Sequence, residues 1–120
     1  MKFTNYMLGA VLCGVLGSAV AGQKLPLEVN LTAHYASGSV SGARHSVDPF
    51  QAIFCRMSNG YEITCGATDA TGKWHRCSST NPALMQMVSM VNETSLIVFS
   101  WDDNDKCTSL EITNSSAYLP

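Results

Sequence analysis

Hydrophobic and polar residues alternate most regularly in the segment 61–68. Tyr61, Ile63, Cys65 and Ala67 would share one face, and Glu62, Thr64, Gly66 and Thr68 would share the other. A period of two residues is typical of a β-strand with one buried face, because successive side chains point to opposite sides. The segment is therefore predicted to be a strand whose first set of side chains faces the core.

Turn sequences border this strand at both ends. Asn59-Gly60 precedes it and is a strong signal for a hairpin. The run 69–72, Asp-Ala-Thr-Gly, follows it and fits a type I turn closed by a glycine with positive φ. The pattern predicts a meander of three antiparallel strands over residues 50–57, 61–68 and 73–78. The first of these is apolar on both faces and is predicted to lie centrally in its sheet.

The cysteines of the meander suggest how the fold is cross-linked. If Asp69 pairs with Lys73 across the second turn, Cys65 lies directly opposite Cys77, close enough for a bridge. This register favours a Cys65–Cys77 disulfide and leaves Cys55 for Cys107. Four cysteines nevertheless allow three pairings, and the sequence alone does not decide among them. In the chain-entropy model, a bridge over twelve residues contributes about 3 kcal/mol of stability.

The remaining segments complete a mainly β chain. Residues 27–35 alternate and predict a strand with one solvated face, whereas the small, polar segment 37–42 predicts a loop or a weak edge strand. Residues 95–101 are apolar on both faces and predict a central strand. A polar turn over 102–105 then leads into a last strand, 106–113. In a regular strand Cys107 would face the side opposite to Leu110 and Ile112. It is therefore expected to lie at the start of the strand or beside a bulge.

One short helix is predicted between the strands. Leu84, Met87, Val88 and Val91 recur at the spacing of a single helical face over residues 82–91. Asn81 is a suitable N-cap, and Pro82 suits the first turn. Together the elements predict a small antiparallel β-sandwich with a helix laid across one sheet and two disulfides. A flattened barrel is the alternative.

The first 21 residues have the pattern of a secretory signal peptide. Lys2 supplies a positive charge, residues 7–16 form an apolar run, and Ala19-Val20-Ala21 is a small-x-small cleavage site. The run is too short for a membrane anchor, and no other segment is apolar enough to span a bilayer. We therefore expect residues 22–120 to form one secreted domain, from which Cys13 has been removed. An oxidising compartment also favours disulfides.

The charge of the chain limits its partners. The formal net charge is −2, with 7 Lys and Arg residues against 9 Asp and Glu residues. The basic residues form no cluster, so nucleic acid and anionic membranes are not expected partners.

Part of the chain resembles a known group of proteins. The run Ala43-Arg44-x-Ser46-x-Asp48 is followed by an aromatic-rich strand and by the four cysteines at their spacing. This layout resembles a group of small, uncharacterised secreted bacterial proteins over about residues 37–120. His45 and Pro49 depart from the pattern. The resemblance implies a secreted bacterial origin and supplies no activity.

No catalytic, metal or cofactor site is predicted. His34, His45 and His75 are scattered without the spacing of metal ligands, and no nucleophile motif accompanies them. The cysteines lack a C-x-x-C pair, so bridges are favoured over a metal. The acidic run 102–105 lacks the glycine and the glutamate of a calcium loop and is typical of a turn.

Two further groups have simple structural interpretations. Arg44 and Asp48 are placed to pair across their loop. Copper could be bound by thioether sulfurs, and the candidates are Met57, Met85, Met87 and Met90. However, methionines at helical spacing usually fill a core, which is the favoured interpretation.

A binding role is the favoured function. Trp74 and Arg76 fall on the face opposite Cys77, where an exposed pair would bind a protein or a glycan. The slightly favoured alternative is that a second layer covers them. Trp101 is a second candidate for an exposed aromatic patch. The sequence thus favours a non-catalytic secreted binding or surface-structural module. The alternative is a small secreted enzyme, or an enzyme inhibitor that uses the Asn59-Gly60 loop.

Overall fold

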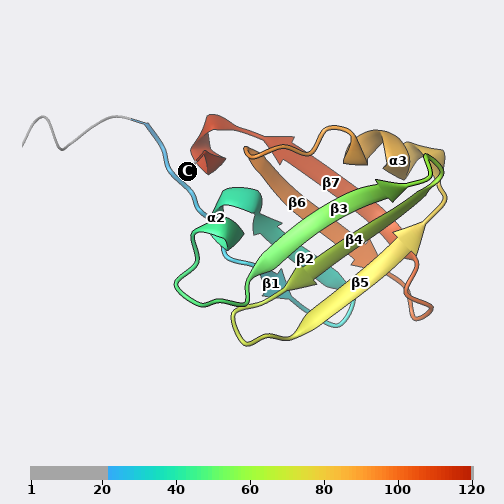
Figure 1. The fold of residues 1–120 in the computed structure, drawn as a ribbon, viewed down its shortest axis with the longest axis horizontal. Helices are drawn as coiled ribbons and strands as arrows, with labels where there is room; N and C mark the ends of the chain where they lie inside the picture. The colour runs from blue at the N-terminus through green and yellow to red at the C-terminus, as the bar shows by residue number, and fades with distance from the viewer. Residues whose placement is uncertain (1–21, 120) are drawn as a thin grey trace, which may run out of the picture.

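The computed structural model describes residues 22–119, in which seven strands form two antiparallel sheets. The four-stranded sheet has the order β1-β2-β6-β7 and the three-stranded sheet the order β3-β4-β5. The strands are β1 (Asn30–Leu31), β2 (Tyr35–Ser39), β3 (Ala52–Ser58), β4 (Glu62–Thr68), β5 (Trp74–Ser79), β6 (Ser95–Trp101) and β7 (Cys107–Asn114). The two sheets lie one over the other (Figure 1), which confirms the predicted sandwich. The predicted signal peptide lies outside the described residues.

The second hairpin of the central meander has the predicted register. Cys65 pairs with Cys77 across β4 and β5, and Asn59 and Gly60 both have positive φ, at 55° and 75°. The first hairpin has a three-residue loop, 59–61, because Ser58 pairs with Glu62 and the Tyr61 N–H donates to the Ser58 carbonyl at 3.3 Å. The expectation that residues 50–57 form a central strand was wrong, because β3 is at the edge of its sheet. Tyr61 was expected to face the core, but it lies in the turn before β4 and is exposed.

The segment 27–35 is not the continuous strand that its alternation predicted. Only Asn30–Leu31 is extended and paired before the chain turns at residues 32–34. The Thr32 N–H and hydroxyl both donate to the carbonyl of Tyr35, which closes this turn. The segment 37–42, predicted as a loop or edge strand, instead completes β2 inside the sheet and begins helix α2 (Val40–Arg44).

Helix α3 (Pro82–Val88) begins as predicted and ends earlier. The Ala83 N–H donates to the Asn81 side-chain oxygen at 2.9 Å, so Asn81 is the N-cap. After Val88 the chain tightens, because the Val91 N–H bonds to the Val88 carbonyl three residues back. Leu84 and Val88 are buried where α3 contacts β3, β4 and β7. A short 3-10 helix, η1 (Ser116–Tyr118), follows β7.

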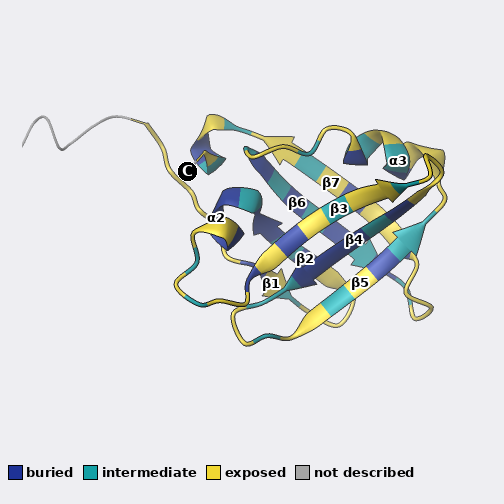
Figure 2. Cartoon of the chain, viewed as in Figure 1, coloured by how far each residue is buried: buried dark blue, intermediate teal, exposed yellow. Residues whose placement is uncertain are grey.

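The core lies between the two sheets, where the buried residues of both gather (Figure 2). Its fully buried hydrophobic side chains include Ile63, Cys65, Ile97 and Phe99, each 0% exposed. Strand β6 lies between β2 and β7, as its apolar sequence predicted. Its inward side chains are all buried, and its outward ones are half-buried.

The disulfide pairing differs from the predicted one. Cys55 is bonded to Cys65 within the three-stranded sheet, and Cys77 is bonded to Cys107 of the other sheet. The prediction was wrong because Cys65 has a cysteine directly opposite on each side, in β3 and in β5. A parallel bridge between Ser78 and Lys106 brings the start of β7 beside β5 and so places Cys107 next to Cys77. Cys107 is the first residue of β7, and a register shift lies opposite it, at Ser100/Trp101.

Candidate binding face

The outward side of β3, β4 and β5 is open to solvent. Its side chains form three rows across the sheet: Ala52, Thr68 and Trp74; Phe54, Gly66 and Arg76; Arg56, Thr64 and Ser78. We call these nine residues the aromatic–arginine face. Trp74 is 60% exposed and Phe54 is 39% exposed, so the slightly favoured expectation that a second layer covers Trp74 and Arg76 was wrong.

Gly66 lies at the centre of this face and lets two side chains approach its backbone. A Cβ atom placed there would be 2.6 Å from Cε1 of Phe54 and 3.0 Å from Cγ of Arg76. The Phe54 ring therefore lies over the bare backbone of Gly66, and the stem of Arg76 lies beside the same glycine. Aromatic rings covering a strand glycine shield its backbone and gain cross-strand packing.

Arg76 contacts the second aromatic residue of the face. Its guanidinium carbon is 5.2 Å from the centroid of the Trp74 ring, within the range of a cation–π contact. Phe54 and Arg76 thus share one row of the sheet on either side of Gly66, and Trp74 lies beside Arg76 in the next row of β5; we call these three side chains the ridge. The cation–π contact and the packing of Phe54 on Gly66 favour one arrangement of these side chains, which lowers the cost of ordering them on binding.

The arginines of the face have no acidic partner within residues 22–119. The ion pairs in this range join His34 to Asp103 at 2.8 Å and His75 to Asp105 at 2.9 Å. Arg56 and Arg76 are exposed and make neither an ion pair nor a side-chain hydrogen bond there. The face is locally positive on a chain whose formal net charge is −2.

The face ends in a hollow of about 310 Å³ at the C-terminal end of β5. Its lining consists of Glu62, Ser78, Ser79, Thr80, Asn81 and Lys106. A second, more apolar hollow of about 220 Å³ lies between the N-terminal segment and the end of η1, and His45 is part of its lining.

Trp101, the other predicted binding residue, belongs to the core. It is 4% exposed, and its ring stacks on that of His75 with centroids 4.2 Å apart. Trp101 is therefore not part of an exposed patch, and that prediction was wrong. His75 is both packed against Trp101 and hydrogen-bonded to Asp105.

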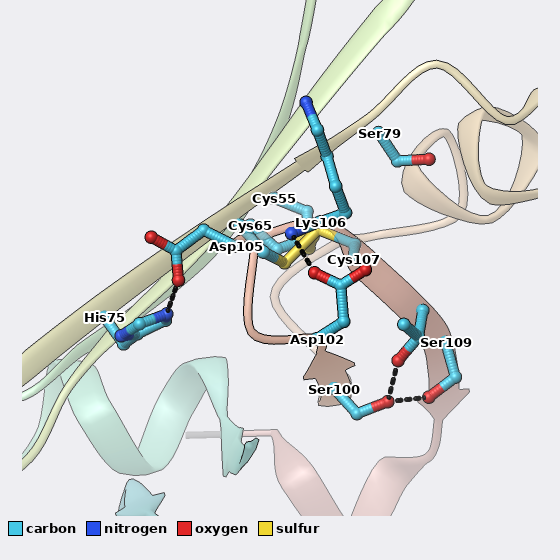
Figure 3. Close-up of a disulfide and its surroundings, with 12 residues drawn as sticks. Cys55, Cys65, His75, Ser79, Ser100, Asp102, Asp105, Lys106, Cys107 and Ser109 are labelled. Carbon is cyan, nitrogen blue, oxygen red and sulfur yellow. Dashed lines mark hydrogen bonds and ion pairs between the residues drawn. A yellow bond between two sulfur atoms is a disulfide. The ribbon is translucent and has the colours of Figure 1, made fainter. Parts of the chain in front are cut away.

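His34 and His75 hold a turn, and His45 lies apart from them at the second hollow. His34 and His75 bond to Asp103 and Asp105, respectively, of the turn that precedes β7, and Figure 3 shows the bond between His75 and Asp105. Over residues 22–119, no hydroxyl or thiol group bonds to a histidine ring. In the same range, no three His, Cys, Asp or Glu side chains are grouped to hold a metal ion.

Asp48 does not pair with Arg44 as expected. The Gln51 amide donates to one of its oxygens at 2.7 Å, and the N–H groups of Phe50 and Gln51 donate to the other. These bonds, the Gln51 side chain first, hold the pKa of Asp48 below its usual 3.8. Gln51 also accepts from the Val29 N–H at 2.9 Å and so ties the N-terminal segment to the sandwich.

The sequence identified Trp74 and Arg76, but not the residues that support them. Phe54 and Gly66 were assigned to strands with no role on the face. The available signal was the isolated glycine inside an alternating strand, which often marks a close approach of another group.

Comparison with known proteins adds no relative. No family model matches the chain, and no match was found among curated proteins or solved structures. Among the described residues, no helix is long and apolar enough to cross a membrane.

Proposed function

We propose that this protein is a non-catalytic, secreted binding module whose aromatic–arginine face binds an acidic glycan chain. The observation that carries the proposal is the exposed ridge of Phe54, Arg76 and Trp74, in which a cation without an acidic partner contacts the Trp74 ring and a second ring, that of Phe54, lies in the next part of the face. Aromatic faces bind the C–H faces of sugar rings, and a guanidinium binds carboxylate or sulfate groups in a planar, bidentate way.

The size of the face favours a slender ligand. Three strands about 4.8 Å apart, two of seven residues and one of six at about 3.4 Å each, cover at most roughly 14 Å by 24 Å. This footprint of about 340 Å² is well below the roughly 800 Å² that each partner buries in a stable protein–protein interface. A single extended chain fits such a strip. The hydroxyls of Thr64, Thr68 and Ser78 lie beside the ridge and suit a hydroxyl-rich chain.

The alternative functions have less support. The rings of His34 and His75 bond to carboxylates, and over residues 22–119 no hydroxyl or thiol group bonds to a histidine ring, which gives a hydrolase no support. The Cys55–Cys65 bridge does close the hairpin that holds Asn59-Gly60, as the inhibitor alternative requires. However, β3 and β4 stay paired up to Ser58 and Glu62, next to the turn, so no extended segment is offered to a protease.

Secretion is part of the same proposal. The two disulfides support an oxidising compartment, and the signal-peptide pattern of residues 1–21 supports export. The resemblance to small secreted bacterial proteins supports a bacterial source.

Titration calorimetry with polyuronate, sulfated and neutral oligosaccharides tests the proposal. We expect Trp74→Ala and Arg76→Gln each to weaken binding of the acidic chains at least tenfold, a loss of about 1.4 kcal/mol. Tyr35→Ala is the matched control, because Tyr35 is 40% exposed on the outward face of the other sheet. Equal affinity for neutral chains, no binding of any glycan, or an equal loss in the control would each contradict the proposal.

A further inference from the structure

The hollow at the end of β5 lies next to the ridge on the same strand. Arg76 and Ser78 are successive outward residues of β5, so they are about 7 Å apart. Ser78 also belongs to the lining of the hollow, whose volume of about 310 Å³ is at the lower end of ligand-pocket sizes. The ridge and the hollow are therefore placed as neighbouring subsites along one extended ligand.

The backbone around the hollow is held by several independent contacts. The Ser78 N–H donates to the Asp105 carbonyl at 3.1 Å, and the Lys106 N–H donates to a side-chain oxygen of Asp102 at 3.0 Å. The disulfide joins Cys77 and Cys107, which directly adjoin Ser78 and Lys106. The walls of the hollow are thus ordered in advance, and little freedom remains to be lost on binding.

Polar groups in the lining remain available to a ligand. The side chain of Lys106 extends away from the turn on the same side as Ser79 (Figure 3). Its ammonium has no carboxylate partner in the described part of the chain. The Asn81 oxygen caps α3, which leaves the amide N–H₂ group free to donate. Glu62 adds a carboxylate that can accept from ligand hydroxyls.

We infer that this hollow is a subsite for a single uronate-type sugar unit, with Lys106 binding its carboxylate and Glu62 accepting from its hydroxyls. This inference rests on the proposed function, because the neighbouring units of the chain lie on the ridge. A cation, a carboxylate and several hydroxyl and amide donors around one small volume match a sugar that carries both hydroxyls and an anion.

The test uses glucuronic acid and its linear oligosaccharides as probes, with amide chemical shifts as the readout. We expect the monosaccharide to shift the resonances of residues 78–81, and Lys106→Gln to abolish those shifts. The same substitution should weaken oligosaccharide binding about tenfold, or about 1.4 kcal/mol. Lys106 contributes to the turn through its backbone, so this variant is expected to keep its fold.

Lys73→Gln is the matched control. Lys73 occupies the equivalent place in the turn before β5, where its N–H donates to Asp69 as that of Lys106 donates to Asp102. It lies at the other end of β5 and should leave the monosaccharide shifts unchanged. An equal effect of both substitutions would reduce the role of Lys106 to general charge and would overturn the inference.

The outcomes separate the subsite from the binding face. If oligosaccharides bind and Trp74→Ala weakens them while Lys106→Gln has no effect, the subsite is refuted and the proposed function stands. If monosaccharide shifts appear at residues 78–81 but Trp74→Ala leaves oligosaccharide binding intact, the proposed function fails instead. If neither probe binds, both fail.

Discussion

Cys65 and Cys77 lie directly opposite each other in neighbouring strands and are not bonded to each other. Cys65 is bonded to Cys55 on its other side, and Cys77 is bonded to Cys107. One row of the three-stranded sheet therefore contains three cysteines, and the fourth comes from the opposite sheet. The two bridges consequently have different roles, one within a sheet and one between the two sheets.

The bridge between the sheets should contribute more to stability. It spans 30 residues, whereas Cys55–Cys65 spans 10. In the chain-entropy model this difference is worth about 1 kcal/mol. We expect Cys77→Ser with Cys107→Ser to lower the free energy of unfolding by about that much more than Cys55→Ser with Cys65→Ser. Denaturant unfolding of the two double variants measures this, and the reverse order would contradict it.

The row of cysteines also predicts a disulfide exchange. In Cys55→Ser, the thiolate of Cys65 faces Cys77 and can attack its sulfur, forming a Cys65–Cys77 bond and releasing Cys107 as a thiolate. We expect non-reducing peptide mapping at mildly alkaline pH to detect this isomer. Cys65→Ser is the control, because the thiol it frees, on Cys55, is two strands away from Cys77. Retention of Cys77–Cys107 in both variants would contradict the prediction.

Gly66 should be required for the shape of the ridge. In Gly66→Ala the new methyl group meets the Phe54 ring at 2.6–2.8 Å, so the ring must move. Overpacking of this kind costs about 1–3 kcal/mol. Adding Phe54→Ala removes the clash, so the double variant should lose less stability than the sum of the two single variants. A double-mutant cycle by thermal or denaturant unfolding measures the coupling, and additive losses would show that the ring does not depend on Gly66.

Asp69 should make the fold sensitive to acid. Hydrogen bonds from the Thr71 hydroxyl first, then from the N–H groups of Thr71 and Lys73, lower its pKa from the usual 3.8. A carboxyl with a lowered pKa in the folded state stabilises the fold above its unfolded pKa, and this contribution is lost as the pH falls through the folded value.

Melting temperatures across the acid range test this dependence. Asp69→Asn should melt below the wild type at about pH 6, and the difference should shrink as the pH falls below about 3.8. Glu111→Gln, an exposed change on β7, is the control and should show no comparable convergence. A constant difference between Asp69→Asn and wild type at all pH values would contradict the assigned cause.

The sequence by itself determined the local structure of the meander and of helix α3. Strand β4 has an alternating pattern, and its flanking turns need residues that adopt positive φ, so neighbours in the sequence decide the register. The N-cap of α3 is equally local, because Asn81 bonds to an N–H group only two residues away. Alternation alone failed for the segment 27–35, since it does not reveal where a strand finds a partner.

Only the tertiary structure decided which cysteines bond and which tryptophan is exposed. The alternation of side chains along the strand showed that Trp74 faces away from Cys77. It did not show whether that side of the sheet would be covered by another layer. The second sheet packs against the opposite side, which leaves Trp74 exposed and buries Trp101 beneath His75. Cys107 reaches Cys77 because β7 begins beside the end of β5. Contacts between sheets join residues far apart in the chain, and no local pattern encodes which residues will meet.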